Sequence, residues 1–285
     1  IEFIKSDNVK TKVSLMSGDK ANYLPARNLK ITVDKEAVVR NGIVPESMKD
    51  QIVDEIVWRI PESVNYLYKN DLMLLDFMAT NDWTRAVYFT SLSDIKNVLG
   101  IDKYLHQEGL SHRFIPVLAA DYHKDAGGVY VEGSYELLMA DDIRWGNLNK
   151  EGVAVDPESR RNLLFVKQAY MRLAQSLLNR GQNDSAVAVL DRCLEFFPDE
   201  KVPYDFYMLA YPEIYYKAGA VEKGDELIDV IINNCLDNLR YYNELNEKFV
   251  NQFLKKNFAL EKQTFQFFNI KNDMFDILRT IFDLN

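Results

Sequence analysis

The spacing of glycine and proline divides this chain of 285 residues into two regions of different character. Nine of the twelve glycines precede residue 153, and the last proline is Pro212. Because these residues interrupt regular structure, the first region is predicted to contain short elements joined by loops, and the second to contain long helices. We place the boundary near Asp156, which predicts an α/β domain at 1–155 and an all-helical domain at 156–285. The expected fold class is therefore α+β.

The stretch YLYKNDLMLLDFMATNDWTRAVYFTS, residues 66–91, is the most distinctive part of the first region. Residues 72–79 are apolar on nearly every side of a helix, with Asp76 as the one charge, and this pattern predicts a buried helix. Asn70 or Asp71 would provide its N-cap, because a short side-chain oxygen accepts the free N–H groups of a first turn.

Strand patterns lie on both sides of this helix. The run 86–89 is β-branched and aromatic, and apolar residues alternate with others over 56–60 before Pro61 ends the run. Strand, helix and strand predict a βαβ unit, and with the next strand a small βαβαβ-like core. Other expected strands are Leu29–Val33, His112–Ala119 and Val129–Val131, and other expected helices are Lys35–Arg40, Asp94–Leu99 (capped by Ser93) and Tyr104–Gly109.

The second region carries the spacing of a tetratricopeptide repeat, in which large and small residues alternate between two antiparallel helices. The positions of the first repeat are Tyr170, Leu173, Ala174, Leu177, Gly181, Ala186, Leu190, Cys193 and Pro198. A less regular copy follows 38 residues later, at Met208, Tyr211, Tyr215, Gly219, Gly224, Ile228 and Ile231. Apolar residues at helical spacing over 249–282 predict a third helical pair that caps the repeats.

Polar residues around the helix at 72–79 form one candidate site. As a functional site they would line a pocket for a sugar or an acceptor peptide. As structural residues they would cap the helix, form turns and place an aromatic lid over the helix end. Adding the polar residues of the following segment, the candidates are Lys69, Asn70, Asp71, Asn81, Asp82, Trp83, Arg85, Tyr104, Glu108 and Arg113.

A second candidate site is a peptide groove in the helical region, since stacked repeats form a concave surface that holds extended peptides. Its aromatic lining would be Tyr204, Tyr207, Tyr211, Tyr215 and Tyr216. The alternative is that this aromatic row belongs to the helical core.

Several functions are not supported by the composition. A net charge of −9 without Lys/Arg clusters argues against nucleic-acid binding. The histidines at 106, 112 and 123 fit no metal-ligand spacing, so neither a metal nor another cofactor is expected. Glu108 could form an acid/base pair with Asp121 or Glu132, as in glycoside hydrolysis, but carboxylates are too abundant for this to be specific. No apolar run is long enough for a membrane span, and the two cysteines are expected to be buried free thiols.

The stretch at 66–91, together with KITVDKEAVVRNGIVP at 30–45 and IDKYLHQEGLSHRFIPV at 101–117, resembles the C-terminal soluble region of bacterial integral-membrane proteins of the O-mannosyltransferase-like, C-class glycosyltransferase type. The resemblance covers about residues 1–120. The matching motifs are Lys69-Asn70-Asp71, Asn81-Asp82-Trp83, and Tyr104 with Glu108-Gly109-Leu110 and Arg113.

This resemblance implies a periplasm-facing, soluble portion of a membrane enzyme whose catalytic residues lie in a separate membrane-embedded portion, so no catalytic residue is assigned here. The implied role is to position acceptor protein or a lipid-linked sugar donor. Two alternatives remain, namely a protein-interaction scaffold formed by the helical repeats and a stand-alone carbohydrate-active enzyme that uses Glu108.

Overall fold

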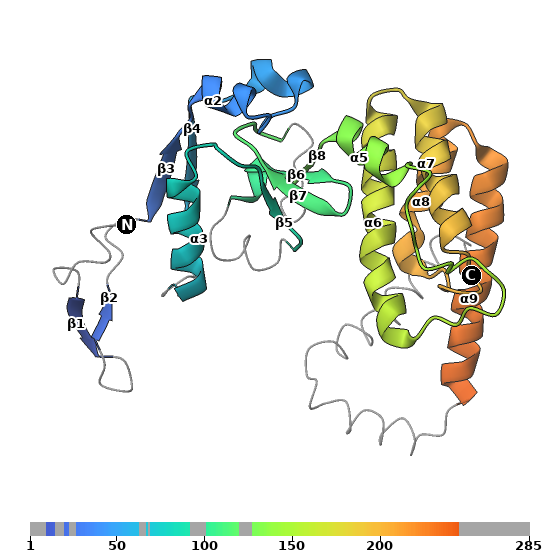
Figure 1. Ribbon diagram of the computed structural model, residues 1–285. Coiled ribbons are helices and arrows are strands. Elements are labelled where there is room, and N and C mark those ends of the chain that lie inside the picture. Colours follow the sequence, from blue (N-terminus) through green and yellow to red (C-terminus); the bar gives the residue numbers. More distant parts are fainter. Residues whose placement is uncertain are drawn as a thin grey trace. The chain divides into compact units, whose positions relative to one another are not determined.

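A computed structural model describes residues 10–14, 20–22, 27–62, 67, 69–91, 101–119 and 127–244 (Figure 1). The chain divides into two compact units. Unit 1 comprises Ile1–Arg144 and Phe165–Leu177, and unit 2 comprises Trp145–Leu164 and Leu178–Asn285. Small sheets lie in the N-terminal part and helices dominate the C-terminal part, which confirms the α+β class. The domain division at residues 155 and 156 stays a prediction.

Two antiparallel strands begin the well-packed part of unit 1. Strand β3 (Asn28–Thr32) pairs with β4 (Glu55–Arg59), and Ile31 lies opposite Ile56. Alternate residues of β4 are buried, as the alternation in the sequence predicted. The connection contains helix α2 (Lys35–Arg40), whose first turn is capped by the Asp34 carboxylate at 2.9 Å from the Ala37 N–H, and the 3-10 helix η2 (Glu46–Gln51). A separate hairpin joins β1 (Lys10–Ser14) and β2 (Lys20–Asn22).

A four-stranded mixed sheet forms the other half of unit 1, in the order β5-β7-β6-β8. Its strands are β5 (Val87–Phe89), β6 (Leu105–Glu108), β7 (Ser111–Phe114) and β8 (Gly128–Val129). Only the β6–β8 pair is parallel among these. The 3-10 helix η3 (Asp102–Tyr104) precedes β6, and helix α5 (Val131–Leu138) follows β8.

The predicted βαβ unit is wrong. Helix α3 (Lys69–Thr80) does follow β4 and precede β5, but these strands belong to different sheets. Each finds an antiparallel partner instead, β3 for β4 and β7 for β5. Nor is α3 buried on all sides, since Met73 and Phe77 are exposed. The helix begins at Lys69, so Asn70 and Asp71 lie in its first turn rather than at its N-cap.

The segment predicted as a helix at Tyr104–Gly109 is mostly strand β6. Gly109 and Leu110 form the two-residue loop of a β-hairpin, with Glu108 opposite Ser111. Gly109 has a positive φ of 64°, and glycine at the first loop position is typical of such hairpins. This glycine outweighs the helix-favouring Leu, Gln and Glu before it. The predicted strand at His112–Ala119 is shorter than expected, because β7 ends at Phe114.

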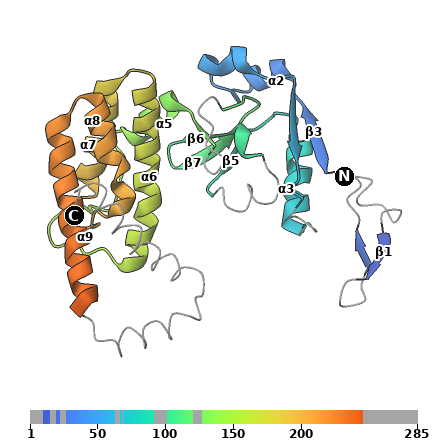
Figure 2. The ribbon, with the colours of Figure 1, turned by 180° about the vertical axis from the view of Figure 1, so that it is seen from behind.

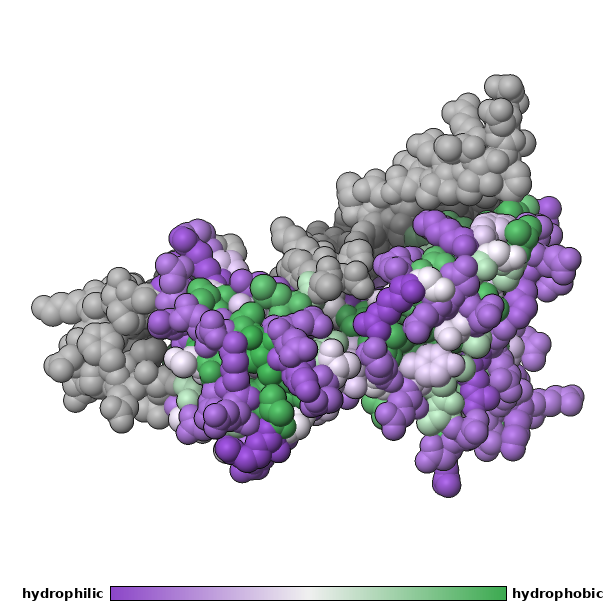
Figure 3. Space-filling model, turned by 90° about the horizontal axis from the view of Figure 1, so that it is seen from above, coloured by the Kyte–Doolittle hydropathy of each residue, from purple (hydrophilic) through white to green (hydrophobic). Residues whose placement is uncertain are grey.

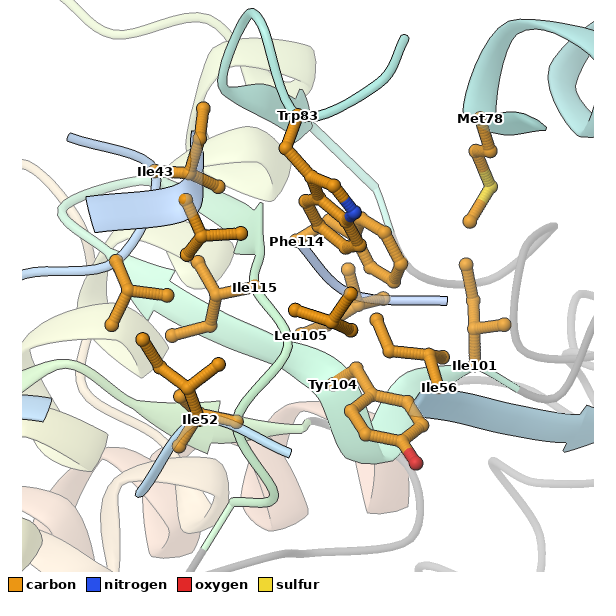
Figure 4. Close-up of a cluster of buried hydrophobic side chains, with 14 of the residues drawn as sticks. Ile43, Ile52, Ile56, Met78, Trp83, Ile101, Tyr104, Leu105, Phe114 and Ile115 are labelled. Carbon is orange, nitrogen blue, oxygen red and sulfur yellow. The ribbon is translucent and has the colours of Figure 1, made fainter. Parts of the chain in front are cut away.

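A hydrophobic cluster joins the two sheets and α3 (Figure 4). Its members include Ile56 of β4, Leu105 of β6, Phe114 of β7, Trp83, and Leu75 and Met78 of α3. Helix α3 accordingly runs beside the β3–β4 pair in both ribbon views (Figures 1 and 2). The stretch at 66–91 therefore contributes core residues on one helix face and in the loop after it.

The helical region contains α6 (Pro157–Asn179), α7 (Asn183–Phe196), α8 (Ala210–Ala218) and α9 (Val221–Glu244), with the 3-10 helix η4 (Phe206–Met208) before α8. Helix α8 packs on α7 and α9. Gly219 ends α8 with a φ of 89°, which L-residues rarely adopt, so this turn glycine of the repeat pattern is required by the backbone. Cys193 in α7 and Cys235 in α9 are buried and form no disulfide, as expected.

Some predicted elements lie outside the described residues. These are the helix at Asp94–Leu99 and the helical pair over 249–282. On the face shown in Figure 3, hydrophilic residues make up most of the coloured surface and hydrophobic residues form smaller areas among them.

Candidate functional site

The ten residues of the predicted polar pocket are distributed over several elements of unit 1. Lys69, Asn70 and Asp71 lie in the first turn of α3, and Asn81, Asp82, Trp83 and Arg85 lie in the loop from α3 to β5. Tyr104 lies in η3, Glu108 on β6 and Arg113 on β7. The structure brings Glu108 and Arg113 into direct contact. The pocket as a whole stays a prediction.

Trp83 and Tyr104 belong to the hydrophobic cluster (Figure 4). The Trp83 indole stacks on Phe114, with ring centroids 6.0 Å apart, and its Nε1 donates to the Thr32 carbonyl at 3.1 Å. The Trp83 carbonyl in turn accepts from the Asn41 side chain at 2.8 Å. These contacts place the Trp83 ring in the hydrophobic core of unit 1.

Glu108 and Arg113 form a largely buried ion pair. The Arg113 Nη1 lies 3.1 Å from Oε1 and 3.3 Å from Oε2 of Glu108, and the two side chains are 11% and 13% exposed. The second guanidinium nitrogen donates to the Gly42 carbonyl in the turn after α2. Arg113 therefore ties the β6–β7 hairpin to the α2 turn.

Tyr88 of β5, whose side chain is exposed, contacts both members of this ion pair. Its hydroxyl donates to Glu108 Oε2 at 2.6 Å, and the Arg113 guanidinium lies 5.6 Å from its ring centroid. Burial, followed by the hydrogen bond to Glu108, raises the pKa of Tyr88 to about 12, so the phenol stays protonated and donates at neutral pH.

Tyr130, at the N-cap of α5, lies near Glu108. Burial, followed by the charges of Glu132 and Glu108, raises the pKa of Tyr130. A Cβ on Gly133 would lie 2.3 Å from the Tyr130 ring and 3.0 Å from Glu108 Oε1, so only glycine allows the ring this approach. Tyr88, Glu108, Arg113 and Tyr130 are named the Glu108 cluster below.

Strand register explains why these residues meet. Tyr88 and Arg113 are directly opposite in the β5–β7 pair, so they share a sheet face. His106 is opposite Arg113, and Glu108, two residues further along β6, lies on that same face. Tyr88 and Tyr130 were not among the candidate residues from the sequence. The hairpin signal at Gly109-Leu110 could have identified the β6–β7 register and with it the Glu108–Arg113 diagonal, but pairing of β5 with β7 depends on tertiary structure.

The opposite face of this sheet holds Arg172, which comes from the part of α6 that belongs to unit 1. Its Nη2 donates to the carbonyls of Gly127 and Gly128 at 3.0 and 3.1 Å, and its Nη1 lies 3.3 Å from Nε2 of His112. Burial lowers the pKa of Arg172 to about 10, which leaves it cationic at neutral pH. Burial, and then the Arg172 charge, lower the pKa of His112 to about 4.

We expect His112 to make unit 1 acid-sensitive. Its pKa is near 6.5 when the chain is unfolded and about 4 when folded, so the unfolded state binds the extra proton below pH 6.5. The contribution of His112 to the free energy of unfolding is therefore fully present above pH 6.5 and falls as the pH is lowered toward 4. The loss is at most about 3 kcal/mol, because each unit of pKa difference between the folded and unfolded states corresponds to about 1.36 kcal/mol.

Denaturant unfolding at pH 7.0 and pH 4.5 would measure this loss. His112→Gln keeps an acceptor for Arg172 but cannot titrate, and it should show a smaller loss over this pH range. Equal losses in the two proteins would contradict the assignment to His112.

Two of the three histidines, which were not expected to bind a metal, lie among the described residues. His106 is buried with Nε2 3.0 Å from the Val117 carbonyl, and His112 is bound to Arg172. His123 lies outside the described residues. Within the described part of the chain, no group of His, Cys, Asp and Glu side chains could hold a metal ion.

The five tyrosines of the predicted peptide groove divide into two sets. Tyr204, Tyr211 and Tyr215 are buried. Tyr215 donates to Asp191 at 2.8 Å, and the Tyr211 hydroxyl lies 3.3 Å from the Cys193 Sγ. Tyr207 is 62% exposed, and Tyr216 is exposed with its hydroxyl donating to Asp225 at 2.9 Å. No single row of five exposed rings is formed.

An open hollow of about 350 Å³ lies in unit 2 between α7 and the α8–α9 turn. Its lining is Asp184, Val187, Ala188, Asp191, Ala218, Gly219 and Ala220. Asp191 is bound by Tyr215 and by Lys223, at 2.8 and 2.5 Å, so it is already neutralised within the fold.

Comparison with known proteins places part of the chain in a family context. Residues 1–132 match the family of TMEM260-associated domain 2. TMEM260 is a membrane glycosyltransferase-like protein, and the match agrees in this coarse sense with the resemblance seen in the sequence. No curated protein and no solved structure matches the chain significantly. Among the described helices, none is long and apolar enough to cross a membrane.

Proposed function

We propose that this chain is a non-catalytic, extramembrane portion of a membrane glycosyltransferase-like protein, and that it helps to position acceptor protein or a lipid-linked sugar donor. The observation that carries the proposal is the match of residues 1–132 to TMEM260-associated domain 2. The chain would lie at the periplasmic face of the inner membrane and have the membrane-embedded catalytic portion as its partner.

The chemistry of the Glu108 cluster supports a non-catalytic role. Glycoside hydrolysis requires two carboxyl groups on either side of the scissile bond. Glu108 is instead bound to a guanidinium and a phenol, at 3.1 and 2.6 Å. This arrangement fixes the carboxylate as an acceptor and disfavours the stand-alone carbohydrate-active enzyme.

The acceptor-positioning role can be tested by NMR titration of the whole chain with extended Ser/Thr-rich peptides. We expect saturable amide shifts at millimolar peptide, and the same peptides with Ser and Thr replaced by Ala serve as the control. Absence of any interaction at millimolar concentration would remove acceptor binding from the proposal. The membrane role has a separate test, because in-frame membrane spans encoded upstream of Ile1 would support it and a complete reading frame without them would exclude it.

The alternative is a protein-interaction scaffold formed by the tetratricopeptide-like repeats that the sequence spacing predicts. It draws support from Tyr207, an exposed aromatic ring that packs on Phe206 with centroids 4.0 Å apart. If the peptides bind here, their shifts should map to residues around Tyr207 and disappear in Tyr207→Ala. Shifts that map to unit 1 would favour the first role.

A further inference from the structure

The Tyr88 ring is both exposed and rigidly held, which is an unusual combination for a large side chain on a sheet surface. It is 46% exposed, yet its hydroxyl is fixed by Glu108 at 2.6 Å and the Arg113 guanidinium lies 5.6 Å from its ring centroid. A ring that is already ordered loses little conformational freedom when a ligand stacks on it. Such a ring provides an apolar platform beside a polar edge.

The polar edge is prearranged as well. Three hydrogen-bonding contacts from Arg113 and Tyr88 orient both oxygens of Glu108, and a carboxylate has about four acceptor positions. Tyr130 brings a second aromatic ring close to Glu108, because Gly133 has no side chain to block its approach. The Glu108 carboxylate, which can accept a further hydroxyl, thus lies close to two tyrosine rings.

Charge selects the class of ligand. Arg113 is the cation of the cluster, and both of its terminal nitrogens are already bound, one to Glu108 and the other to the Gly42 carbonyl. A phosphate or carboxylate ligand would be repelled by the Glu108 carboxylate, while both terminal nitrogens of Arg113 are already engaged. A neutral polyhydroxyl ring would donate to Glu108 and place its C–H face on Tyr88.

We propose that the Glu108 cluster binds a neutral saccharide ring, with the exposed face of Tyr88 as the stacking surface and Glu108 as the hydroxyl acceptor. This inference rests on the proposed function and specifies the ligand of unit 1. That ligand is a neutral sugar attached to an acceptor, and not the phosphate-linked sugar of a donor. Glu108 and Arg113 were candidates from the sequence, and Tyr88 supplies the contact surface that they lack.

The test is an NMR titration of the whole chain with methyl glycosides of neutral hexoses, with a hexose 1-phosphate and with glucuronic acid. We expect saturable shifts at the amides of Tyr88, Glu108 and Gly133 with at least one neutral glycoside, and weaker binding of both anions. Tyr88→Leu, which keeps an apolar strand residue but removes the ring, should weaken binding at least tenfold. Phe77→Leu, which makes the matching change at an equally exposed ring on α3, should bind like the wild type.

Three outcomes would overturn the inference: no saturable shift with any neutral glycoside, binding of the hexose 1-phosphate as tight as that of the glycosides, or unchanged binding in Tyr88→Leu. Folding of each variant is checked from the dispersion of its own amide spectrum. The glycoside titration and the peptide titration test different ligands. A negative result with glycosides overturns only the saccharide inference, and a negative result with peptides overturns only the acceptor-binding role.

Discussion

Replacing Trp83 by alanine is expected to lower the free energy of unfolding of unit 1 by about 3–5 kcal/mol, as found for large-to-small changes of buried aromatic residues. Three contacts are lost together: the stack on Phe114, the hydrogen bond to the Thr32 carbonyl, and the packing within the hydrophobic cluster. Denaturant unfolding followed by far-UV circular dichroism measures the effect without relying on the fluorescence of the deleted indole.

Two neighbouring variants separate the causes. Trp83→Phe keeps a ring for the stack but leaves the Thr32 carbonyl without its donor, so a smaller loss of about 1–2 kcal/mol is expected. Asp82 has the same left-handed backbone, with φ of 45° beside 55° at Trp83, but its side chain is exposed. Asp82→Gly should therefore change stability by less than about 1 kcal/mol or raise it slightly. If Trp83→Ala unfolds like Asp82→Gly, the ring does not hold the two sheets together.

Elements of unit 1 that are determined by the hydrophobic periodicity of their own residues were predictable from the sequence. Strand β4 follows directly from the alternation of Ile56 and Trp58 with exposed residues, and α2 from its compact helical segment before the turn at Gly42. The pairing of strands was not predictable, because the order strand, helix, strand allows either a parallel crossover or two separate antiparallel partners. That choice depends on β3 and β7, which lie on opposite sides of this stretch in the sequence.

The site was only partly accessible to sequence reasoning for the same reason. Glu108 and Arg113 stand five residues apart, and a hairpin loop at Gly109-Leu110 would have placed them on one sheet face. Tyr88 comes from a strand 20 residues before Glu108, and its position depends on a register that no local signal carries. Trp83 has the residue type of a binding site, but its environment makes it a core residue.

Replacing Arg113 by methionine is the second change expected to have a large effect. Methionine keeps the apolar stem but leaves the Glu108 carboxylate, which is 13% exposed, with Tyr88 as its remaining donor from the cluster. Removing one partner of a buried pair typically costs about 3–5 kcal/mol, because the other charge stays desolvated. The matched control is Arg59→Met, which breaks the exposed ion pair with Glu62 and should cost less than about 1 kcal/mol.

A double-mutant cycle shows whether Arg113→Met destabilises unit 1 by leaving the Glu108 carboxylate without its cation or by removing packing contacts of the Arg113 side chain. In the Glu108→Gln/Arg113→Met variant no uncompensated carboxylate remains, and the amide can still accept from Tyr88. We therefore expect the double variant to be more stable than Arg113→Met alone, with a coupling free energy of about 1–3 kcal/mol measured by denaturant unfolding. Additive losses would show that Arg113 acts through its contact with the Gly42 carbonyl and its stem rather than through Glu108. The contribution of Arg113 to stability would then come from its contact with the α2 turn, and the orientation of the Glu108 acceptor would depend mainly on Tyr88.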